Sequence, residues 1–558
     1  YWPSNDSLWL VFIAPLIAIP IFWQLGLYKA IIRFIGFKAI WTCAQAVSLY
    51  ALLWGIIGFM AAIEGIPRSV ILINWLLALI AITGLRMFGH WVLLSKVNTE
   101  KNRNVVIYGA GDAGRQLSIA LMQSDEFSLI FFIDDDQKLQ NQSINGIHVI
   151  SIDQFKVVIE KNNIQEVLIA IPSISRSRRN EIFRFLESFP IVVRSLPGIA
   201  ELAQGKIKVD DLLNIEISDL LGREPVVPNK YLLETNISKK VVLVSGAGGS
   251  IGSELCRQIM LLKPHKLVLF DISESSLYRI DQELIDMDIP NIDIVPIIGS
   301  TSDKERLIYI CNYYRVKTIY HAAAYKHVPL VELNPAQGVL NNAIGTKIAA
   351  EAAIAANVET FVLISTDKAV RPTNVMGATK RIAELALQAL ANEPHNTCFT
   401  MVRFGNVLDS SGSVIPLFKK QIKAGGPITV TDYNVVRYFM TIPEAVELVI
   451  QAGAMAKGGE VFVLDMGEPI RIDDLAKKMI KLSGLQLLDE DNPDGDIQIQ
   501  YIGLRPGEKL YEELLIEGDF HPTENNLIKK SEEEMINWDK LELMMKLLKE
   551  IAINGEHK

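Results

Sequence analysis

The sequence predicts an α/β protein in which N-terminal transmembrane helices precede two Rossmann-like domains. Each domain is expected to be a doubly wound parallel sheet, and the second to carry a smaller C-terminal part. Three long apolar runs fill the first hundred residues, and two later segments each contain a strand, a glycine-rich turn and a helix in that order. At 558 residues the chain is long enough for roughly three or four folded units. We expect the boundaries at 1–98, 99–235 and 236–558.

The composition argues against several classes of function. The net charge of -9 disfavours a nucleic-acid-binding surface, which is usually basic. The four cysteines are far apart and form no C-x-x-C pair, so they indicate neither a disulfide framework nor a zinc site. We therefore expect no nucleic-acid partner and no bound metal.

The apolar runs at residues 8–28, 39–63 and 70–94 are each long enough for the ~20 residues that cross a bilayer as a helix. Buried core helices are the competing interpretation. Three such runs in succession, nearly free of charge, favour membrane insertion instead. A cleaved signal peptide would need only one apolar region followed by a small-residue cleavage site, and none follows.

The charges around these runs predict their orientation. The segment between the second and third runs carries only Glu64 and Arg68. Basic residues lie in the other two flanking segments: Lys29, Arg33, Lys38, Lys96, Lys101 and Arg103. Because cytoplasmic loops are rich in Lys and Arg, the first loop and everything after residue 94 should face the cytoplasm.

The first Rossmann-like unit begins with a buried-type strand at 105–108, followed by G-x-G-x-x-G at 109–114 and an apolar helix. A second strand at 129–133 ends in three aspartates at 134–136, where a ribose-binding carboxylate would lie. The pattern predicts a nucleotide-binding type of fold and leaves the ligand open. Residues 198–240 read as a linker to the next domain.

The second unit repeats the pattern with the elements needed to bind a dinucleotide. A strand at 240–244 leads into G-x-x-G-x-x-G, and the next strand, at 266–270, ends in an aspartate 19 residues after the last glycine. The glycines permit a tight turn and close approach of a pyrophosphate, and the helix N-terminus offers free N–H groups. A carboxylate at the ribose favours NAD over NADP. The residues predicted to bind the cofactor here are Gly246, Gly249, Ser250, Ile251, Gly252 and Asp271.

A segment of small residues follows a strand at 318–320. Ala322, Ala323 and Ala324 would let the backbone pass close to a flat cofactor, and Asn342, at the start of the next helix, is also predicted to contact it. His321 and His327 are candidate ligands, but neither has clustered partners, and a structural role is favoured for both.

Three reactive side chains follow the apolar strand at 361–364. These are Thr366, Asp367 and Lys368, at a strand end where ligands of open α/β sheets gather. A helix begins near Met376, and Lys380 lies one turn further on the same face. The competing interpretation is an ordinary solvated loop.

Taken together, these motifs resemble the extended short-chain dehydrogenase/reductase superfamily. More narrowly, the chain resembles the membrane-bound UDP-N-acetylglucosamine 4,6-dehydratases of bacterial polysaccharide and glycan synthesis, over essentially its whole length. The resemblance rests on the glycines of 246–252, Asp271, A-A-A-Y-K-H-V-P at 322–329, S-T-D-K-A at 365–369 and M-G-A-T-K at 376–380. It implies NAD as cofactor, a UDP-sugar as substrate, a homo-oligomer, and a multi-pass protein of the bacterial inner membrane with a cytoplasmic catalytic domain.

Two positions depart from the superfamily pattern. Met376 stands where the superfamily has the Tyr of Tyr-x-x-x-Lys, and a thioether cannot accept a proton at neutral pH. The membrane-bound dehydratases resemble this chain in having Met there. Ser300 stands where many relatives have an Asp directed at the adenine, so that contact is not expected.

The resemblance implies an internal redox cycle. NAD+ takes a hydride from C4 of the hexose, water leaves across C5 and C6, and the hydride returns to C6. Asp367 would be the acid for the C6 hydroxyl, Lys368 the base for the C5 proton, and Thr366 would hold the C4 oxygen. Lys380 would bind the nicotinamide ribose. Asp367 must be protonated and Lys368 neutral at some point, so burial is expected to shift both pKa values. A water or Asp367 would accept the C4 hydroxyl proton.

The resemblance also assigns nucleotide-sugar contacts, mostly in the C-terminal part. Arginine suits a diphosphate because its guanidinium donates two parallel hydrogen bonds. A surface salt bridge is the competing interpretation for each arginine. Arg403 belongs to one of the matching segments, and the predicted substrate-binding residues are Lys326, Asn406, Val407, Ser413, Arg437, Arg505 and Glu508.

Other functions are compatible with parts of the pattern. A UDP-hexose 4-epimerase shares oxidation at C4 but needs no acid at C6, so Asp367 and Lys368 disfavour it. A non-catalytic nucleotide-binding membrane scaffold would explain Met376 but not the intact strand-end residues. A membrane glycosyl-1-phosphate transferase has a similar N-terminal half but no need of an NAD site at 246–271.

Overall fold

The computed structural model describes residues 5–25, 27, 37–60, 69–95, 103–122, 124, 126–171, 176–186, 189, 191–195, 213–214, 228–513 and 520–555. The chain divides into two compact units, of which one comprises Tyr1–Arg103 with Leu121–Ser128 and the other Asn104–Ala120 with Leu129–Lys558. Of the basic residues that predicted the membrane orientation, Lys29, Arg33, Lys96 and Lys101 lie outside the described residues, as does most of the predicted linker.

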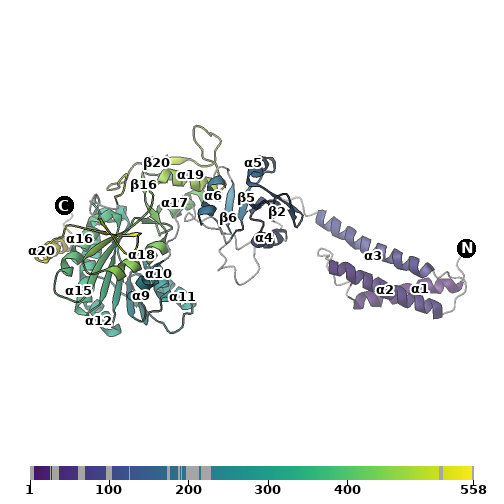
Figure 1. Ribbon diagram of the computed structural model, residues 1–558, viewed down its shortest axis with the longest axis horizontal. Helices are drawn as coiled ribbons and strands as arrows, with labels where there is room; N and C mark the ends of the chain where they lie inside the picture. The colour runs from purple at the N-terminus through teal and green to yellow at the C-terminus, as the bar shows by residue number, and fades with distance from the viewer. Residues whose placement is uncertain are drawn as a thin grey trace. The chain divides into compact units, whose positions relative to one another are not determined.

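Three N-terminal helices match the three predicted apolar runs: α1 (Asn5–Gln24), α2 (Phe37–Met60) and α3 (Ser69–Ser95). They are the purple and blue-violet helices of Figure 1. Tyr50, Ala51 and Trp54 of α2 form a small core with apolar side chains of α1 and α3. The segments Trp41–Met60 and Ser69–Phe88 are long and apolar enough to cross a membrane, and the apolar helix Phe12–Gln24 is shorter.

The first α/β domain contains a seven-stranded sheet in the order β3-β4-β2-β1-β5-β6-β7. Its central strands are parallel, and the two edge strands pair antiparallel. The strands are β1 (Arg103–Tyr108), β2 (Phe127–Ile133), β3 (Ser143–Ile144), β4 (Ile147–Ile150), β5 (Glu166–Ile169), β6 (Val192–Ser195) and β7 (Leu213–Asn214). The helices are α4 (Asp112–Met122), α5 (Ile152–Lys161) and α6 (Arg176–Leu186). The strands predicted at 105–108 and 129–133 are confirmed as β1 and β2.

The second domain is built on a nine-stranded sheet in the order β10-β9-β8-β11-β12-β13-β18-β22-β21. Seven neighbouring strands, β10 to β18 in that order, are parallel, and β22 and β21 are antiparallel. The bounds are β8 (Val241–Ser245), β9 (Lys266–Asp271), β10 (Asp293–Ile298), β11 (Thr318–His321), β12 (Thr360–Ile364), β13 (Cys398–Arg403), β18 (Glu460–Leu464), β21 (Phe520–Pro522) and β22 (Ile528–Ser531). From β8 the chain adds strands outward to one side, as far as β10, and then continues on the other side with β11. Ligands of doubly wound folds bind at this switch point in the strand order, between β8 and β11.

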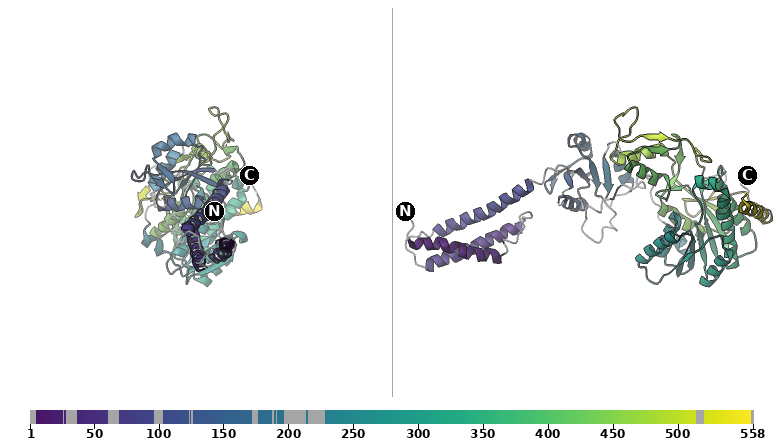
Figure 2. Two further views of the ribbon diagram at one scale, coloured as in Figure 1. Left: turned by 90° about the vertical axis from the view of Figure 1, so that its right-hand side faces the viewer. Right: turned by 180° about the vertical axis from the view of Figure 1, so that it is seen from behind.

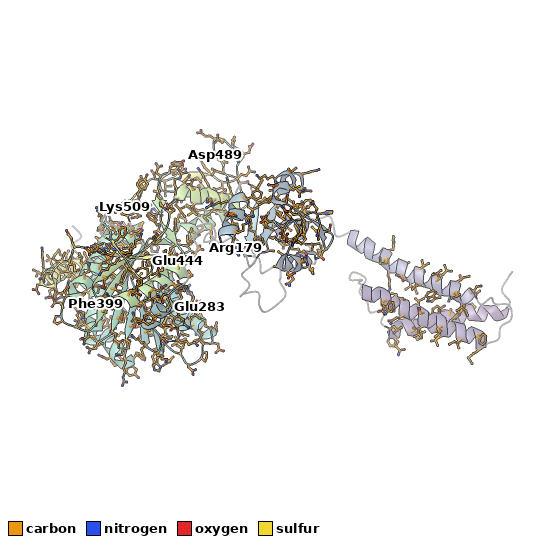
Figure 3. All side chains as sticks on the ribbon, in the orientation of Figure 1. Arg179, Glu283, Phe399, Glu444, Asp489 and Lys509 are labelled. Carbon is orange, nitrogen blue, oxygen red and sulfur yellow. The ribbon has the colours of Figure 1, made fainter. Side chains whose placement is uncertain are left out.

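Helices cover both faces of this sheet (Figures 1 and 2). Two large apolar clusters fill the spaces between the helices and the sheet, one on each face, and β8, β12 and β18 are buried throughout, as strands of a doubly covered parallel sheet should be. Phe399 of β13 lies in one of these clusters (Figure 3). The helices are α9 (Lys230–Thr235), α10 (Ser250–Leu261), α11 (Glu274–Asp286), α12 (Lys304–Tyr314), α13 (Val328–Leu333), α14 (Pro335–Gly338), α15 (Gly345–Ala355), α16 (Val375–Ala391), α18 (Ile442–Met455) and α20 (Trp538–Asn554). Helix α9 lies near the C-terminal end of the segment that was predicted to be a linker.

The smaller C-terminal part has its own core beside the strand ends. It contains three two-stranded pairs and two helices: β14 (Asn406–Val407) with β17 (Phe439–Met440), β15 (Ile428–Val430) with β20 (Ile499–Tyr501), β16 (Val436–Arg437) with β19 (Ile470–Arg471), α17 (Val414–Lys423) and α19 (Ile472–Leu482). Ile415, Phe418 and Ile480 are among its fully buried residues. Because the segments after β13 and β18 supply this part, it faces the carboxyl ends of the parallel strands.

Candidate functional site

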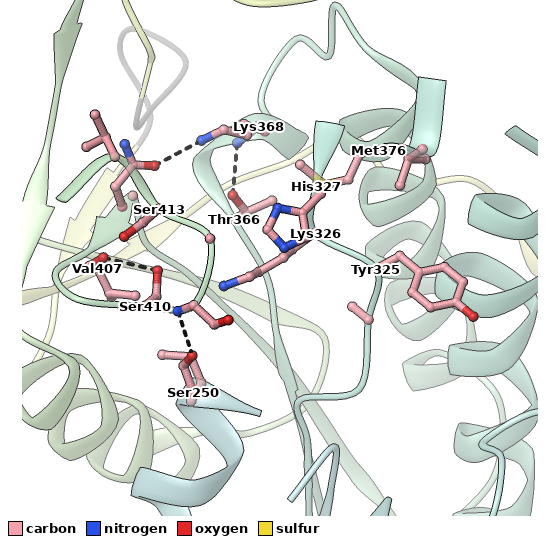
Figure 4. Close-up of a pocket in the computed structure, with 18 of the residues that line it drawn as sticks. Ser250, Tyr325, Lys326, His327, Thr366, Lys368, Met376, Val407, Ser410 and Ser413 are labelled. Atoms are coloured by element: carbon pink, nitrogen blue, oxygen red, sulfur yellow. Dashed lines mark hydrogen bonds between the residues drawn. The ribbon is translucent and has the colours of Figure 1, made fainter. Parts of the chain in front are cut away.

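A cavity of about 890 Å3 lies between the carboxyl ends of the parallel strands and the smaller C-terminal part (Figure 4). It brings together most of the predicted site residues from distant parts of the chain. Those that line it are Gly246, Gly249, Ser250, Ile251, Gly252, Ala322, Ala324, Lys326, Thr366, Lys368, Met376, Lys380, Asn406, Val407, Ser413, Arg437, Arg505 and Glu508. Asp271, Ala323, Asn342 and Asp367 are not part of its lining.

One wall of the cavity is the glycine-rich turn between β8 and α10. Gly246 has φ +69°, and a Cβ there would lie 2.7 Å from the backbone nitrogen of Ala323. A Cβ on Gly252 would lie 1.9 Å from the carbonyl oxygen of Gly246. Both positions exclude any side chain, because the turn, the helix and the segment after β11 pack backbone against backbone. Ala323 therefore contributes through this close approach and not by lining the cavity.

Asp271 lies at the end of β9, behind the turn. Its two carboxylate oxygens accept hydrogen bonds from the backbone N–H groups of Gly248 and Ser273, each at 2.8 Å. The side chain thus connects the glycine-rich turn to the start of α11. Each oxygen retains a second lone pair, so the predicted contact with a ribose hydroxyl stays a prediction.

Asn342 is not part of the cavity lining, and its predicted contact with the cofactor stays a prediction. It is fully buried in the π-helix Val339–Ile344 and makes hydrogen bonds to both backbone groups of Tyr325 and to the Thr379 hydroxyl. These bonds hold the segment that carries Lys326. An asparagine near a helix start suggests a polar contact, but the sequence does not reveal which way the side chain points.

His321 has the structural role that was favoured from the sequence. Its ring nitrogens are within hydrogen-bond distance of the Ser245 hydroxyl, at 2.8 Å, and the Thr346 hydroxyl, at 3.1 Å. Burial, and then the nearby Lys380, lower the pKa of His321 to about 3, so it is neutral. His327, by contrast, lines the cavity.

The strand-end cluster lies in the 3-10 turn Asp367–Ala369 that follows β12. Oδ1 of Asp367 accepts hydrogen bonds from the Thr366 hydroxyl at 2.8 Å and from Nζ of Lys368 at 3.0 Å. Nζ of Lys368 also lies 3.3 Å from Oδ1 of Asn406. Asp367 is only 2% exposed and lies beneath Lys368, with Gly405 packed against its other oxygen. Lys368 and Thr366 thus meet the cavity, with Asp367 in direct contact behind them.

The pKa of Lys368 is shifted in the direction opposite to the one that burial alone would give. Burial lowers the pKa of its amine, but the Asp367 and Glu512 carboxylates raise it by more, and the net pKa lies above its ordinary value. That Lys368 becomes neutral at some point in the reaction stays a prediction. Glu512 was not predicted. Its only signal in the sequence is its place after R-P-G-E-K at 505–509.

Helix α16 supplies Met376 and Lys380 to the same wall. Nζ of Lys380 donates a hydrogen bond of 2.7 Å to the carbonyl oxygen of Ile364, the last residue of β12. Burial lowers the pKa of Lys380 to about 8, against the opposing effect of Glu384. Gly377 lets the helix begin close to the strand-end turn, since a Cβ there would lie 2.2 Å from the carbonyl oxygen of Lys368.

The predicted substrate-binding residues other than Lys326 belong to the smaller C-terminal part, on the opposite wall. The Arg437 guanidinium is buried and donates to Oε1 of Glu508 at 3.1 Å and to the carbonyl oxygens of Val436, Lys509 and Leu510. It therefore holds the segment 508–510 against β16. Arg505 is exposed at the cavity. The hydroxyl of Ser413 is buried and has no hydrogen-bond partner among the described residues, so it is available to a ligand.

Arg403 does not line the cavity, although its segment was matched to the nucleotide-sugar contacts. Its fully buried guanidinium donates to Oε1 of Glu384 at 2.8 Å and Oε2 at 2.6 Å, and also pairs with Glu533. Alternation along β13 directs Arg403 to α16 and the chain's C-terminal segment. A lone arginine at a strand end does not reveal which face of the sheet it occupies.

No group of three or more His, Cys, Asp or Glu side chains is arranged to hold a metal ion within the part of the chain that the structure describes. The ionisable side chains that line the cavity include Lys326, Lys368 and Lys380.

Comparison with known proteins gives two family matches and several relatives. Residues 242–531 match a family described as "Polysaccharide biosynthesis protein", and residues 26–197 match one described as "CoA-binding domain". The chain is 31% identical over 294 residues to a UDP-N-acetylglucosamine 4,6-dehydratase (inverting) of Campylobacter jejuni, covering 51% of this chain and 80% of the relative. It is 32% identical over 281 residues to a UDP-glucose 4-epimerase of Rickettsia massiliae, covering 50% and 77%.

A longer similarity exists to the capsular polysaccharide biosynthesis protein CapD of Staphylococcus aureus. The two are 44% identical over 457 residues, which cover 81% of this chain and 75% of CapD. With the family match over the larger α/β domain, this similarity shows that the chain belongs to the polysaccharide biosynthesis protein family.

Proposed function

We propose that this chain catalyses the NAD-dependent 4,6-dehydration of UDP-N-acetylglucosamine to a UDP-4-keto-6-deoxy-N-acetylhexosamine, for bacterial surface glycan synthesis. The observation that carries the proposal is the contact between Lys368 and Asp367, 3.0 Å apart at a strand end facing the glycine-rich turn. An amine and a carboxyl group side by side are what elimination across C5 and C6 requires. The similarity to the Campylobacter jejuni dehydratase supports the same reaction.

The residues around the turn fit NAD. Gly246, Gly249 and Gly252 form a cradle that side chains at 246 and 252 would fill, and the N–H groups at the start of the twelve-residue helix α10 are directed at a pyrophosphate position. When bound, NAD would accept the hydride from C4 of the sugar and return it to C6. Lys380 and the small residues Ala322 and Ala324 would hold its nicotinamide end.

The proton transfers fall to the strand-end cluster. A ketone at C4 acidifies the C5 proton, and Lys368, the cluster member that meets the cavity with a nitrogen, is the base for it. Asp367 delivers a proton to the departing C6 hydroxyl and, through the Thr366 hydroxyl that it already binds, is connected to the C4 oxygen. Met376 takes no part in proton transfer, and a water or Asp367 accepts the C4 hydroxyl proton.

The diphosphate and uridine would lie along the smaller C-terminal part. Arg437 and Arg505 supply positive charge there, and the unpartnered Ser413 hydroxyl supplies a hydrogen bond. Lys326 faces the same cavity, and burial lowers its pKa. Asn406, Val407 and Glu508 complete the set of residues that we assign to the UDP-sugar.

Epimerisation at C4 is the second candidate, because the similarity to the Rickettsia massiliae epimerase is equally strong. Proton NMR of UDP-N-acetylglucosamine incubated in D2O with the purified full chain, without added cofactor, separates the two. A new C6 methyl signal with deuterium at C5 is expected. Appearance of UDP-N-acetylgalactosamine would establish the epimerase, and bound NAD with no change in any UDP-sugar would favour a non-catalytic scaffold.

We also place the N-terminal helices in the bacterial inner membrane, with the α/β domains in the cytoplasm. Large apolar side chains of α1, α2 and α3 point outward, including Leu16, Trp23, Leu52, Phe59, Leu77 and Leu85, and lipid would cover them. The full chain should sediment with membranes and be released by detergent but not by alkaline carbonate. Light scattering in detergent should show a homo-oligomer.

A further inference from the structure

A second carboxylate faces Lys368 from a different part of the chain. Oε1 of Glu512 lies 3.8 Å from Nζ of Lys368 and 4.0 Å from Nε of Arg437, and its side chain is only 5% exposed. Its segment is tied to β16, where the Val436 N–H donates to the carbonyl oxygen of Leu510 at 3.1 Å. Glu512 is not part of the cavity lining, but both of its cationic neighbours, Lys368 and Arg437, are.

Lys368 can act as the proposed base only after its ammonium has lost a proton to an acceptor. In the arrangement seen here two carboxylates raise the pKa of Lys368 and so favour its ammonium form, which cannot take the C5 proton. Its Asp367 partner is already assigned to the C6 hydroxyl. Because the Lys368 side chain is only 18% exposed, solvent is a poor acceptor. Among the residues that the structure describes, Glu512 is the other carboxylate within ion-pair distance of Lys368.

The charged groups around Glu512 make it suited to hold that proton. Lys368 and Asp367 face it from the strand-end turn, Arg437 from β16, and Lys509 from its own segment. Burial and the nearby Asp367 raise the pKa of Glu512, and the three cations lower it by less, so the net pKa lies above its ordinary value. A diphosphate bound at Arg437 would neutralise one of those cations and so favour the protonated carboxyl further.

We propose that Glu512 accepts the proton of Lys368 when the UDP-sugar fills the cavity and returns it when the product leaves. An N–H bond of the ammonium breaks, an O–H bond forms on Glu512, and the freed amine lone pair takes the C5 proton. The ammonium so formed, whose N–H hydrogens exchange with solvent, later donates one of them to C5. The charges of both partners disappear together, so no external acid or base is consumed. This inference rests on the proposed function and specifies how its base becomes active.

The test compares Glu512→Gln with Glu513→Gln in the full chain. The amide introduced by Glu512→Gln has nearly the shape of the carboxylate but cannot accept a proton, whereas Glu513 pairs with Lys509 and Arg371 at the surface. At pH 7 we expect Glu512→Gln to slow C5 deuterium incorporation from D2O by at least about tenfold, with UDP binding retained. Its rate relative to wild type should rise with pH, because Lys368 must then lose its proton to solvent. Glu513→Gln should behave as wild type at every pH.

Three results would overturn the inference. One is a Glu512→Gln rate equal to wild type. Another is a loss that is the same at every pH, which would indicate a structural role. The third concerns Glu512→Asp, which keeps a carboxylate as proton acceptor and should therefore retain the wild-type pH dependence at a reduced rate. If its rate instead depends on pH as we expect for Glu512→Gln, proton transfer to residue 512 is excluded. If wild type itself makes no methyl product, the proposed function fails instead, so the two failures are distinguishable.

Discussion

Arg403 and Glu384 form a doubly hydrogen-bonded ion pair in the interior of the larger α/β domain, with N–O distances of 2.8 and 2.6 Å. Glu384 also accepts from the Ser365 hydroxyl at 2.6 Å and pairs with Arg381. The pair thus connects the end of β13, the residue before Thr366, and helix α16, which carries Lys380. The geometry of the strand end therefore depends on a charge pair that does not touch the cavity.

Replacing Arg403 by Met should be strongly destabilising. It leaves Glu384 buried with one cation fewer, and breaking a buried pair costs about 3–5 kcal/mol, which corresponds to a fall of roughly 10 °C in melting temperature for a domain of this size. Thermal melting of the full chain in detergent would measure it. The control is Arg257→Met, whose pair with Glu283 lies at the surface (Figure 3) and should be worth less than about 1 kcal/mol. Equal shifts for the two variants would contradict the assignment.

The pH dependence of the reaction should report Lys380. Its pKa is lowered to about 8, so the amine is charged below that pH and neutral above it. If the charged form assists oxidation at C4, kcat should fall with an apparent pKa near 8 as the pH rises. In Lys380→Arg the guanidinium stays charged, and the fall should move to higher pH. An unchanged alkaline limb in that variant would show that another group titrates.

Replacing Met376 by Leu should leave the rate within about threefold of wild type. The two side chains have similar volumes, and a thioether offers no proton-transfer chemistry that a leucine would remove. Steady-state assay of methyl product is the measurement, with Met376→Ala as the comparison that opens space in the buried wall. A loss of more than about tenfold in Met376→Leu would assign a specific role to the sulfur.

The glycine-rich turn predicts an order of cofactor loss. A Cβ on Gly252 would meet the Gly246 carbonyl oxygen at 1.9 Å, whereas one on Gly249 would meet it at 3.3 Å. We expect Gly252→Ala to purify without NAD and Gly249→Ala to retain part of it, because only the first forces the turn and helix apart. Quantifying NAD released on denaturation tests this. Equal occupancy in the two variants would mean that close packing at 252 is not required for binding.

Local elements could be predicted from the sequence because their causes are local. The strands at 240–244 and 361–364 are apolar runs of strand length and appear as β8 and β12, each within one residue of the predicted bounds. The turn at 246–252 was predictable because only glycine tolerates the backbone contacts found there. Thr366, Asp367 and Lys368 follow from their place after a parallel strand.

The tertiary structure decided how the side chains pair. The sequence did not show that Arg403 faces Glu384, that Asn342 bonds Tyr325, or that Glu512 lies beside Lys368. Each pairing depends on how the crossover connections and the smaller C-terminal part bring distant segments together. The hydrophobic periodicity of one segment does not indicate which other segment packs against it. The charge of Lys368 follows the same rule: its position was predictable, but its protonation depends on which carboxylates the fold places within a few ångströms.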